Sequence, residues 1–304
     1  MLLLAVPAAH ATARFDPQAL DRKLRTEHGV LSVLVERDGR LIFERYYHGS
    51  ARSAHLDVFS VTKSVISSLV GIALHDGTLR SLDARLGDFF PADVQHAHDR
   101  RIRRITLRQL LTMTSGYRDV PAVSSDDWIH AQIDRPLAAD PGRSWGYDNG
   151  SYHLLSAVLT KATALTASAY ARRVLFGPLG ITAPNWATDG QGHSLGNTGL
   201  RLSSRDLLRL GELFLRQGRW RGQQIVPAAY VRAATRSTTV FGKGFGYGYG
   251  WWVLGGPAGF AALGYGGQEI AVFPSRHVIV VLTGADSQRE HVLYGDVLPA
   301  LHLR

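Results

Sequence analysis

Hydrophobic and polar residues alternate along residues 31–47, in the stretch LSVLVERDGRLIFERYY. Alternation with a period of two is typical of half-buried β-strands. Asp38 and Gly39 interrupt it, and an Asp-Gly pair between two such runs favours a tight hairpin turn. The pattern therefore predicts a β-hairpin near the start of the chain.

The stretch VISSLVGIALHDGTL has apolar residues around most of a helical circumference: Val65, Ile66, Leu69, Val70, Ile72 and Ala73. A helix that is apolar on nearly every side is a buried one. Gly77 supplies a stop signal. We therefore predict a buried helix that begins near Ser60.

From about residue 84 to 235 the patterns are mainly helical. TLRQLLTMTSG predicts a short helix that closes near Gly116, while SYHLLSAVLTKATAL and SSRDLLRLGELFLRQG repeat every 3.6 residues. Ser203 and Ser204 are the candidate N-caps of the last of these.

Past residue 245 the pattern returns to strands, in YGWWVL, GFAALGY, EIAVFP and HVIVVLTG, and a final helix is expected over 289–301. The glycine-rich tract 242–250 is interpreted as a flexible lead-in to a strand. Strands at both chain ends predict an α+β fold, with one antiparallel sheet formed from both ends, flanked by helices and interrupted by an inserted, mainly helical domain. We expect residues 12–83 and 236–304 to form the sheet domain and 84–235 the helical domain, with a site in the cleft between them.

Composition narrows the function classes. With 45% hydrophobic and 19% charged residues among 304, a sizeable core is expected. The chain has no cysteine, which excludes disulfides, thiolate metal sites and cysteine nucleophiles. The net charge of +9 comes from arginines that are spread along the whole chain, although Arg100, Arg101, Arg103 and Arg104 cluster. No aromatic residues interleave with that cluster, so we expect a solvated basic surface and no nucleic-acid partner.

The N-terminal run MLLLAVPAAHA ends in an A-x-A cleavage pattern but lacks a positively charged n-region. We interpret residues 1–11 as a signal-peptide remnant and expect a periplasmic or secreted protein, or a cytoplasmic one if the run is not a signal. No later segment has 18 uninterrupted apolar residues, so no transmembrane segment is expected.

Three patterns are interpreted as chance matches. Residues 142–146 and 192–196 both fit G-x-S-x-G, but that motif needs a strand before it and a helix after it, and neither stretch has them. His96 and His98 lie in a polar, arginine-rich stretch, predicted as a loop, without further ligands in the following helix, so we expect no metal. GKGFGYGYG does not fit a nucleotide-binding loop, and we expect no cofactor.

Ser60 and Lys63 form the candidate with a physical rationale. The chain has only four lysines against thirty arginines, and this one is embedded in apolar sequence. Positions three apart on a helix share a face, so the amine can reach the hydroxyl. A serine nucleophile needs a base, and burial lowers a lysine pKa toward that role. The positive end of the helix dipole would also favour a developing oxyanion. As a pattern by itself, S-x-x-K also fits the plain opening of a core helix.

Two further motifs follow in order. Tyr147–Asp148–Asn149 stands just before a predicted helix, and Tyr265–Gly266–Gly267–Gln268 stands between two predicted strands. Consecutive glycines remove side chains from a strand edge, which lets a substrate pair with the backbone. Taken singly, Tyr147 could be a helix-start aromatic and the glycines a tight turn.

With all three motifs the chain resembles the serine β-lactamase and penicillin-binding superfamily, in particular the class C-like branch of D-alanyl-D-alanine carboxypeptidases, carboxylesterases and 6-aminohexanoate-dimer hydrolases. The likeness covers about residues 30–300, through phrases such as DGTLRSLDARLGDFFP, PGRSWGYDNGSYHLLS and GNTGLRLSSRDLLRLGELFL. It implies Ser60 as acylated nucleophile, Lys63 as its base and Tyr147 as proton relay. It further implies that Asn149 orients Lys63 and the substrate, and that the N–H groups of Ser60 and Gln268 form the oxyanion hole.

One departure bears on the substrate. The superfamily usually carries Lys-Thr-Gly or His-Thr-Gly where this chain has Tyr265, Gly266 and Gly267, so the cation that binds a substrate carboxylate is missing unless Lys243 or an arginine replaces it. Nearby aromatics suggest an apolar, uncharged acyl or leaving group: Trp145, Phe245, Tyr247, Trp251 and Tyr265. The leading hypothesis is a serine hydrolase acting on a small ester or amide. The alternatives are a β-lactamase or D-alanyl-D-alanine carboxypeptidase acting on a β-lactam or peptide, and a non-hydrolysing penicillin-binding or sensor module.

Overall fold

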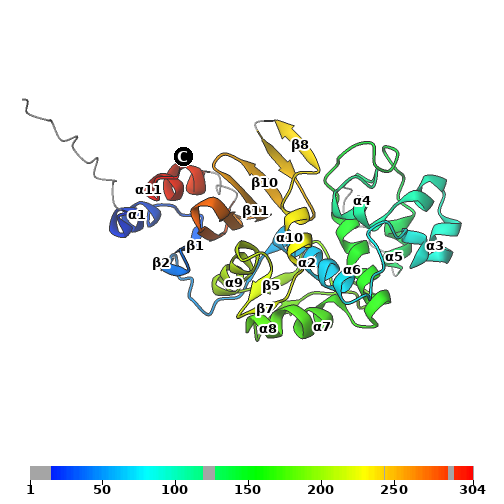
Figure 1. The fold of residues 1–304 in the computed structure, drawn as a ribbon, viewed down its shortest axis with the longest axis horizontal. Helices are drawn as coiled ribbons and strands as arrows, with labels where there is room; N and C mark the ends of the chain where they lie inside the picture. Colours follow the sequence, from blue (N-terminus) through cyan, green and yellow to red (C-terminus); the bar gives the residue numbers. More distant parts are fainter. Residues whose placement is uncertain (1–14, 119–126, 243, 287–290, 304) are drawn as a thin grey trace, which may run out of the picture.

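The computed structural model describes residues 15–118, 127–242, 244–286 and 291–303. Its centre is an eight-stranded antiparallel sheet of order β2-β1-β13-β12-β11-β10-β9-β8 (Figure 1). The strands are β1 (Val30–Arg37), β2 (Arg40–Tyr46), β8 (Thr239–Gly242), β9 (Phe245–Tyr247), β10 (Trp252–Gly255), β11 (Ala258–Gly264), β12 (Gln268–Phe273) and β13 (Val278–Gly284). The predicted α+β fold is confirmed.

Both chain ends build this sheet, as predicted. β1 pairs with β2 on one side and with β13, the last strand, on the other. Asp38 and Gly39 turn the hairpin with φ of 52° and 73°, the left-handed conformation that a tight hairpin of this kind requires.

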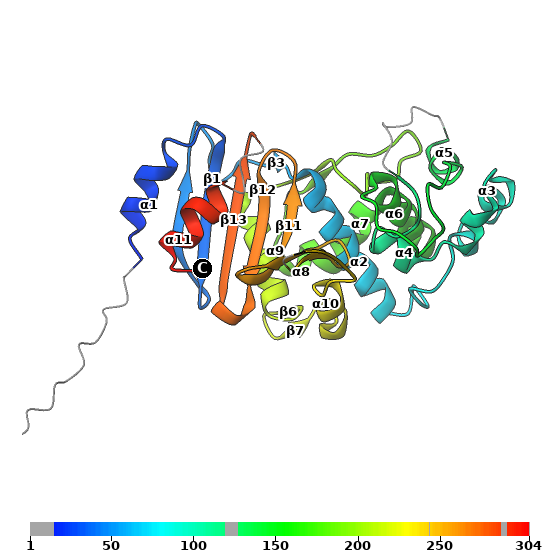
Figure 2. The ribbon, with the colours of Figure 1, turned by 90° about the horizontal axis from the view of Figure 1, so that it is seen from above.

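Helices cover both faces of the sheet (Figure 2). One face carries α1 (Pro17–Leu24), the π-helical segment His291–Val297 and α11 (Leu298–Ala300), and the other carries α2 (Thr62–His75) and α9 (Ser204–Leu215). Successive residues of β13 therefore enter different cores: Val280 packs under the first layer and Val281 under the second. This explains why β13 is a continuous apolar run, because a strand covered on both faces has no solvent side.

The remaining helices lie beyond α2 and around the sheet edge. They are α3 (Pro91–His96), α4 (Leu107–Leu111), α5 (Trp128–Ile133), α6 (Asn149–Thr163), α7 (Ala167–Ala171), α8 (Gly177–Leu179) and α10 (Ala228–Ala234). Short strands accompany them: β3 (Leu56–Asp57), β4 (Asn185–Trp186), β5 (Leu200–Leu202), β6 (Arg219–Trp220) and β7 (Gln223–Gln224). The proposed domain limits stay a prediction. Within the described ranges, no helix has the length and apolar character needed to cross a bilayer.

Some local predictions need correction. α4 ends at Leu111 rather than near Gly116, because Met113 takes a left-handed φ of 59° that a helix cannot continue through. The tract 242–250, interpreted as a lead-in to a strand, itself contains a strand, because its residues 245–247 form β9. His96 ends α3 instead of lying in a loop. Ser203 is the N-cap of α9, as predicted, with its Oγ accepting from the backbone N–H of Asp206 at 3.2 Å. Residues 1–11 and 289–290 lie outside the described residues.

Candidate active site

Ser60 lies in a 3₁₀ turn, Phe59–Val61, that leads directly into α2. Phe59 has a φ of 46°, a strained conformation for a bulky residue, of the kind that costs about 1–3 kcal/mol and occurs at functional sites. The Oδ1 atom of Asp57 accepts from the backbone N–H of Phe59 at 2.7 Å and holds this turn in place. The sharp turn puts Ser60 at the positive end of the α2 dipole.

Lys63 lies one turn further on, with only 2% of its surface exposed. Its Nζ donates to Ser60 Oγ at 2.9 Å, to Asn149 Oδ1 at 2.7 Å and to the Asn197 carbonyl at 3.2 Å. The last two oxygens are acceptors without a hydrogen to give, so they occupy N–H groups of the amine. The remaining position on Nζ then faces Ser60, whether it holds a proton or the lone pair of the neutral amine.

The Asn197 carbonyl is a contact that the sequence analysis missed. It lies in the loop between β4 and β5, where Gly196 makes a close approach to α6. A Cβ on Gly196 would stand 1.9 Å from the Tyr152 carbonyl oxygen, so only glycine permits this approach. The sequence signal was the stretch GNTGL, which carries part of the resemblance but was assigned no role at the site.

Tyr147 completes the group around the nucleophile. Its Oη donates to Ser60 Oγ at 2.8 Å, and Lys63 Nζ lies 4.9 Å from the centre of its ring. The structure therefore brings together four residues singled out in the sequence, although they come from two segments 87 positions apart: Ser60, Lys63, Tyr147 and Asn149.

A buried ion pair holds the segment 147–149. Asp148 is the N-cap of α6 and accepts from the Ser151 backbone N–H at 2.7 Å. Arg135 donates to both Asp148 carboxylate oxygens, at 2.7 and 3.1 Å, and lies over the Tyr117 ring. Burial alone raises the pKa of Asp148, but the bonds and charge of Arg135, with the bonds from Ser151, outweigh it and hold that pKa below its usual value.

The third motif forms the turn between β11 and β12. Gly266 and Gly267 have φ of 75° and 86°. The side-chain amide of Gln268 donates through Nε2 to the Gly284 carbonyl at 2.7 Å, which connects the turn to the end of β13. Gly264 lies against the segment that carries Ser60, since a Cβ there would stand 2.3 Å from the Val58 carbonyl oxygen. The oxyanion-hole role of the Ser60 and Gln268 N–H groups stays a prediction.

The aromatic residues are only partly where the sequence analysis expected them. The prediction that Trp251 lines the site is wrong, because its ring is buried, with its centroid 4.2 Å from that of Phe214 and 5.4 Å from that of Phe260. Its neighbour Trp252 takes that place and stacks on Tyr147. Side chains of adjacent strand residues point to opposite faces, and the pair Trp251–Trp252 does not reveal which one faces the core. Tyr265 is 73% exposed, with its ring against Phe59 at 5.6 Å.

Neither G-x-S-x-G serine has the setting of a nucleophile elbow. Ser144 is exposed and precedes no strand-to-helix turn. Ser194 is fully buried, and its Oγ accepts from the Ser168 backbone N–H at 3.0 Å. In the segment of His96 and His98, His98 pairs with a side chain of the protein: its Nδ1 lies 2.7 Å from a carboxylate oxygen of Asp134.

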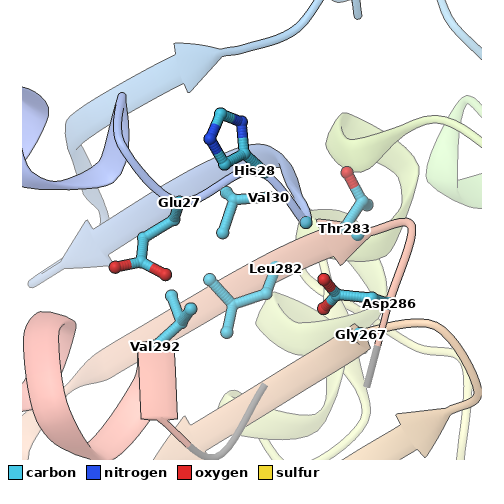
Figure 3. A pocket seen from close by; sticks show the side chains of 10 residues that line it. Glu27, His28, Val30, Gly267, Leu282, Thr283, Asp286 and Val292 are labelled. Atoms are coloured by element: carbon cyan, nitrogen blue, oxygen red, sulfur yellow. The ribbon is translucent and has the colours of Figure 1, made fainter. Parts of the chain in front are cut away.

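Two other groups of residues do not include Ser60, Lys63 or Tyr147. Glu27, His291 and Asp296 have ligand atoms within 4.8 Å of one another, but Lys23 already pairs with Asp296. A hollow lies between the start of β1 and the end of β13. Figure 3 shows the carboxylates of Glu27 and Asp286 among the side chains that line it. Its lining contains none of Ser60, Lys63 or Tyr147, and we place no chemistry there.

Comparisons with known proteins agree with this fold. Among the many solved structures that share the fold, three serve as examples. The first is a Bacillus anthracis protein provisionally named a 6-aminohexanoate-dimer hydrolase, with a TM-score of 0.79 and 20% identity over 92% of this chain and 81% of that one. The second is an octameric penicillin-binding protein homologue from Pyrococcus abyssi, with a TM-score of 0.76 and 19% identity over 95% of this chain and 78% of that one. The third is EstCE1, a hydrolase with promiscuous acyltransferase activity, with a TM-score of 0.76 and 18% identity over 94% of this chain and 99% of that one. A search of curated proteins found no match. The family model named Beta-lactamase matches residues 18–296, nearly the whole chain. The chain therefore belongs to the beta-lactamase family.

Proposed function

We propose that the chain is a serine hydrolase that cleaves an ester or amide bond through an acyl-enzyme. The observation that supports this most is the pair of contacts at Ser60 Oγ, 2.9 Å from Lys63 Nζ and 2.8 Å from Tyr147 Oη. A serine oxygen within hydrogen-bond distance of a base and of an acid has the arrangement that nucleophilic acyl transfer requires.

In the proposed reaction, neutral Lys63 takes the Ser60 proton as Oγ attacks the substrate carbonyl carbon. Backbone N–H groups at the start of α2 and in the 266–268 turn would stabilise the oxyanion. Tyr147 gives a proton to the leaving alcohol or amine as its bond to carbon breaks, and the proton on Lys63 restores the tyrosine. Water then attacks the acyl-enzyme, loses its proton along the same route, and the carboxylic acid leaves as Ser60 regains its hydrogen.

The surroundings favour an uncharged substrate. Where relatives carry a cation, this chain has Tyr265, largely exposed and packed on Phe59. Lys243, the alternative cation, lies outside the described residues. A β-lactamase or D-alanyl-D-alanine carboxypeptidase is the second candidate, supported by the family match, and a non-hydrolysing penicillin-binding or sensor module is the third.

A substrate screen separates these candidates. We expect turnover of nitrophenyl acetate and butyrate with a burst of nitrophenolate, and catalytic efficiencies for nitrocefin and a D-Ala-D-Ala peptide at least about tenfold lower. Faster nitrocefin turnover would support the β-lactamase, and a persistent acyl adduct without turnover would support the binding module. Ser60→Ala should abolish ester turnover, while Ser144→Ala, which removes an exposed serine, serves as the matched control and should leave it unchanged.

A further inference from the structure

Four aromatic side chains form a continuous surface beside Tyr147, here termed the aromatic wall: Trp145, Phe241, Phe245 and Trp252. They come from the segment before α6 and from β8, β9 and β10. The Trp252 ring is nearly parallel to those of Tyr147 and Phe245, with centroids 6.4 and 5.3 Å apart. Phe241 packs on Trp145 at 4.5 Å, so the four rings are in one chain of contacts.

Unlike the hydrophobic core, the aromatic wall is partly exposed to solvent. Phe241 is 42% exposed and its neighbour Val240 is 63% exposed, while Trp145, Phe245 and Trp252 are half-buried. Exposed clusters of apolar side chains occur at binding sites for ligands, proteins or membranes. The position of the aromatic wall next to the proposed reaction centre makes the substrate the natural occupant.

The contacts with Tyr147 indicate which part of the substrate binds here. This step rests on the proposed function, in which Tyr147 protonates the leaving atom. A proton donor must lie within hydrogen-bond distance of the atom that it protonates. The leaving group therefore departs beside Tyr147, and the rings packed around Tyr147 line its path.

We propose that the aromatic wall is the leaving-group subsite, selective for uncharged aromatic or arylalkyl alcohols and amines. The same subsite then serves the reverse step. An arylalkyl alcohol that binds there gives its proton to the Tyr147–Lys63 pair, its oxygen attacks the acyl carbon, and the bond from that carbon to Ser60 Oγ breaks as the serine regains a proton. The product is an ester of the added alcohol, formed in competition with hydrolysis.

Partitioning of one acyl-enzyme between two alcohols tests this directly. The enzyme is acylated with nitrophenyl butyrate in the presence of 2-phenylethanol or of ethanol, which differ by the phenyl group. Butyrate and the two butyrate esters are quantified by gas chromatography. Because both alcohols meet the same acyl-enzyme, the ratio of ester to butyrate reports only on acceptor binding and attack. We expect 2-phenylethanol to be favoured over ethanol about tenfold per mole.

Phe241→Ala should lower that preference to about threefold or less; Trp252→Leu provides a second variant if the first fails to fold. Tyr294→Ala is the matched control, because Tyr294 is a similarly exposed aromatic (40%) in the π-helical segment. Equal partitioning to both alcohols, no transfer to either, or a preference that survives both wall variants would overturn the subsite. An enzyme with no burst at all would instead overturn the proposed hydrolase function, so the two failures are distinguishable.

Discussion

Replacing Arg135 by glutamine tests whether the buried ion pair holds the segment that contacts Ser60. Both partners are inaccessible, with side-chain exposures of 6% for Arg135 and 0% for Asp148. Removing one partner of such a pair leaves a buried charge uncompensated, which costs about 3–5 kcal/mol. We therefore expect Arg135→Gln to lower the free energy of unfolding by about that amount at pH 7, and Tm by roughly 5–8 °C.

The pH dependence of that loss distinguishes a lost charge pair from general damage. In the wild type the pKa of Asp148 is lower in the folded protein than its unfolded value of 3.8, so the ionised carboxylate stabilises the fold at pH values above 3.8. This stabilisation is lost as pH falls through the folded pKa. Without Arg135, burial raises that pKa, so the variant loses stability as pH rises above about 4. The difference in unfolding free energy should therefore be small near pH 3.5 and large at pH 7.

Urea unfolding followed by fluorescence at several pH values measures this difference. Arg80→Gln is the matched control, because it removes an equal charge from an exposed side chain. A loss below 1 kcal/mol at pH 7, or an equal loss at both pH values, would refute the reasoning. Hydrolysis of nitrophenyl butyrate should also slow in Arg135→Gln, since Asp148 lies between Tyr147 and Asn149.

Three further predictions concern other parts of the chain. Burial and the adjacent Glu212 raise the pKa of Glu36 from 4.5 to about 7. Between these pH values the folded protein holds a proton that the unfolded chain releases, so the free energy of unfolding falls as pH rises from about 4.5 to 7. Glu36→Gln should remove this pH dependence and raise the free energy of unfolding at pH 8, measured in urea, by ~2 kcal/mol. Lys63→Arg replaces the amine by a guanidinium, which stays protonated and cannot accept the Ser60 proton, so stopped-flow acylation should slow by about 10²–10⁴-fold; an unchanged rate would contradict the role. Gly196→Ala forces the loop away from α6 and should reduce kcat by about tenfold or more, whereas a variant as active as the wild type would show that the Asn197 carbonyl is dispensable.

The sequence predicted well where a local pattern has one structural solution. The alternation of hydrophobic and polar residues and an Asp-Gly pair predicted the first hairpin. The three-residue spacing on an apolar helix predicted that the Lys63 amine lies beside Ser60. It failed where tertiary contacts decide. Whether Trp251 or Trp252 faces Tyr147 depends on the side on which β10 packs, and the Asn197 carbonyl is a backbone atom with no side-chain signature.

The measurement that tests the central claim most directly is acid-quench mass spectrometry during the burst with nitrophenyl butyrate, followed by tryptic digestion. We predict one butyryl group on the peptide of residues 53–63, located on Ser60 by fragmentation, in an amount equal to the burst, and neither burst nor adduct in Ser60→Ala. A burst that persists in Ser60→Ala, or a butyryl group located on Ser53, Ser144 or Ser194, would contradict the account.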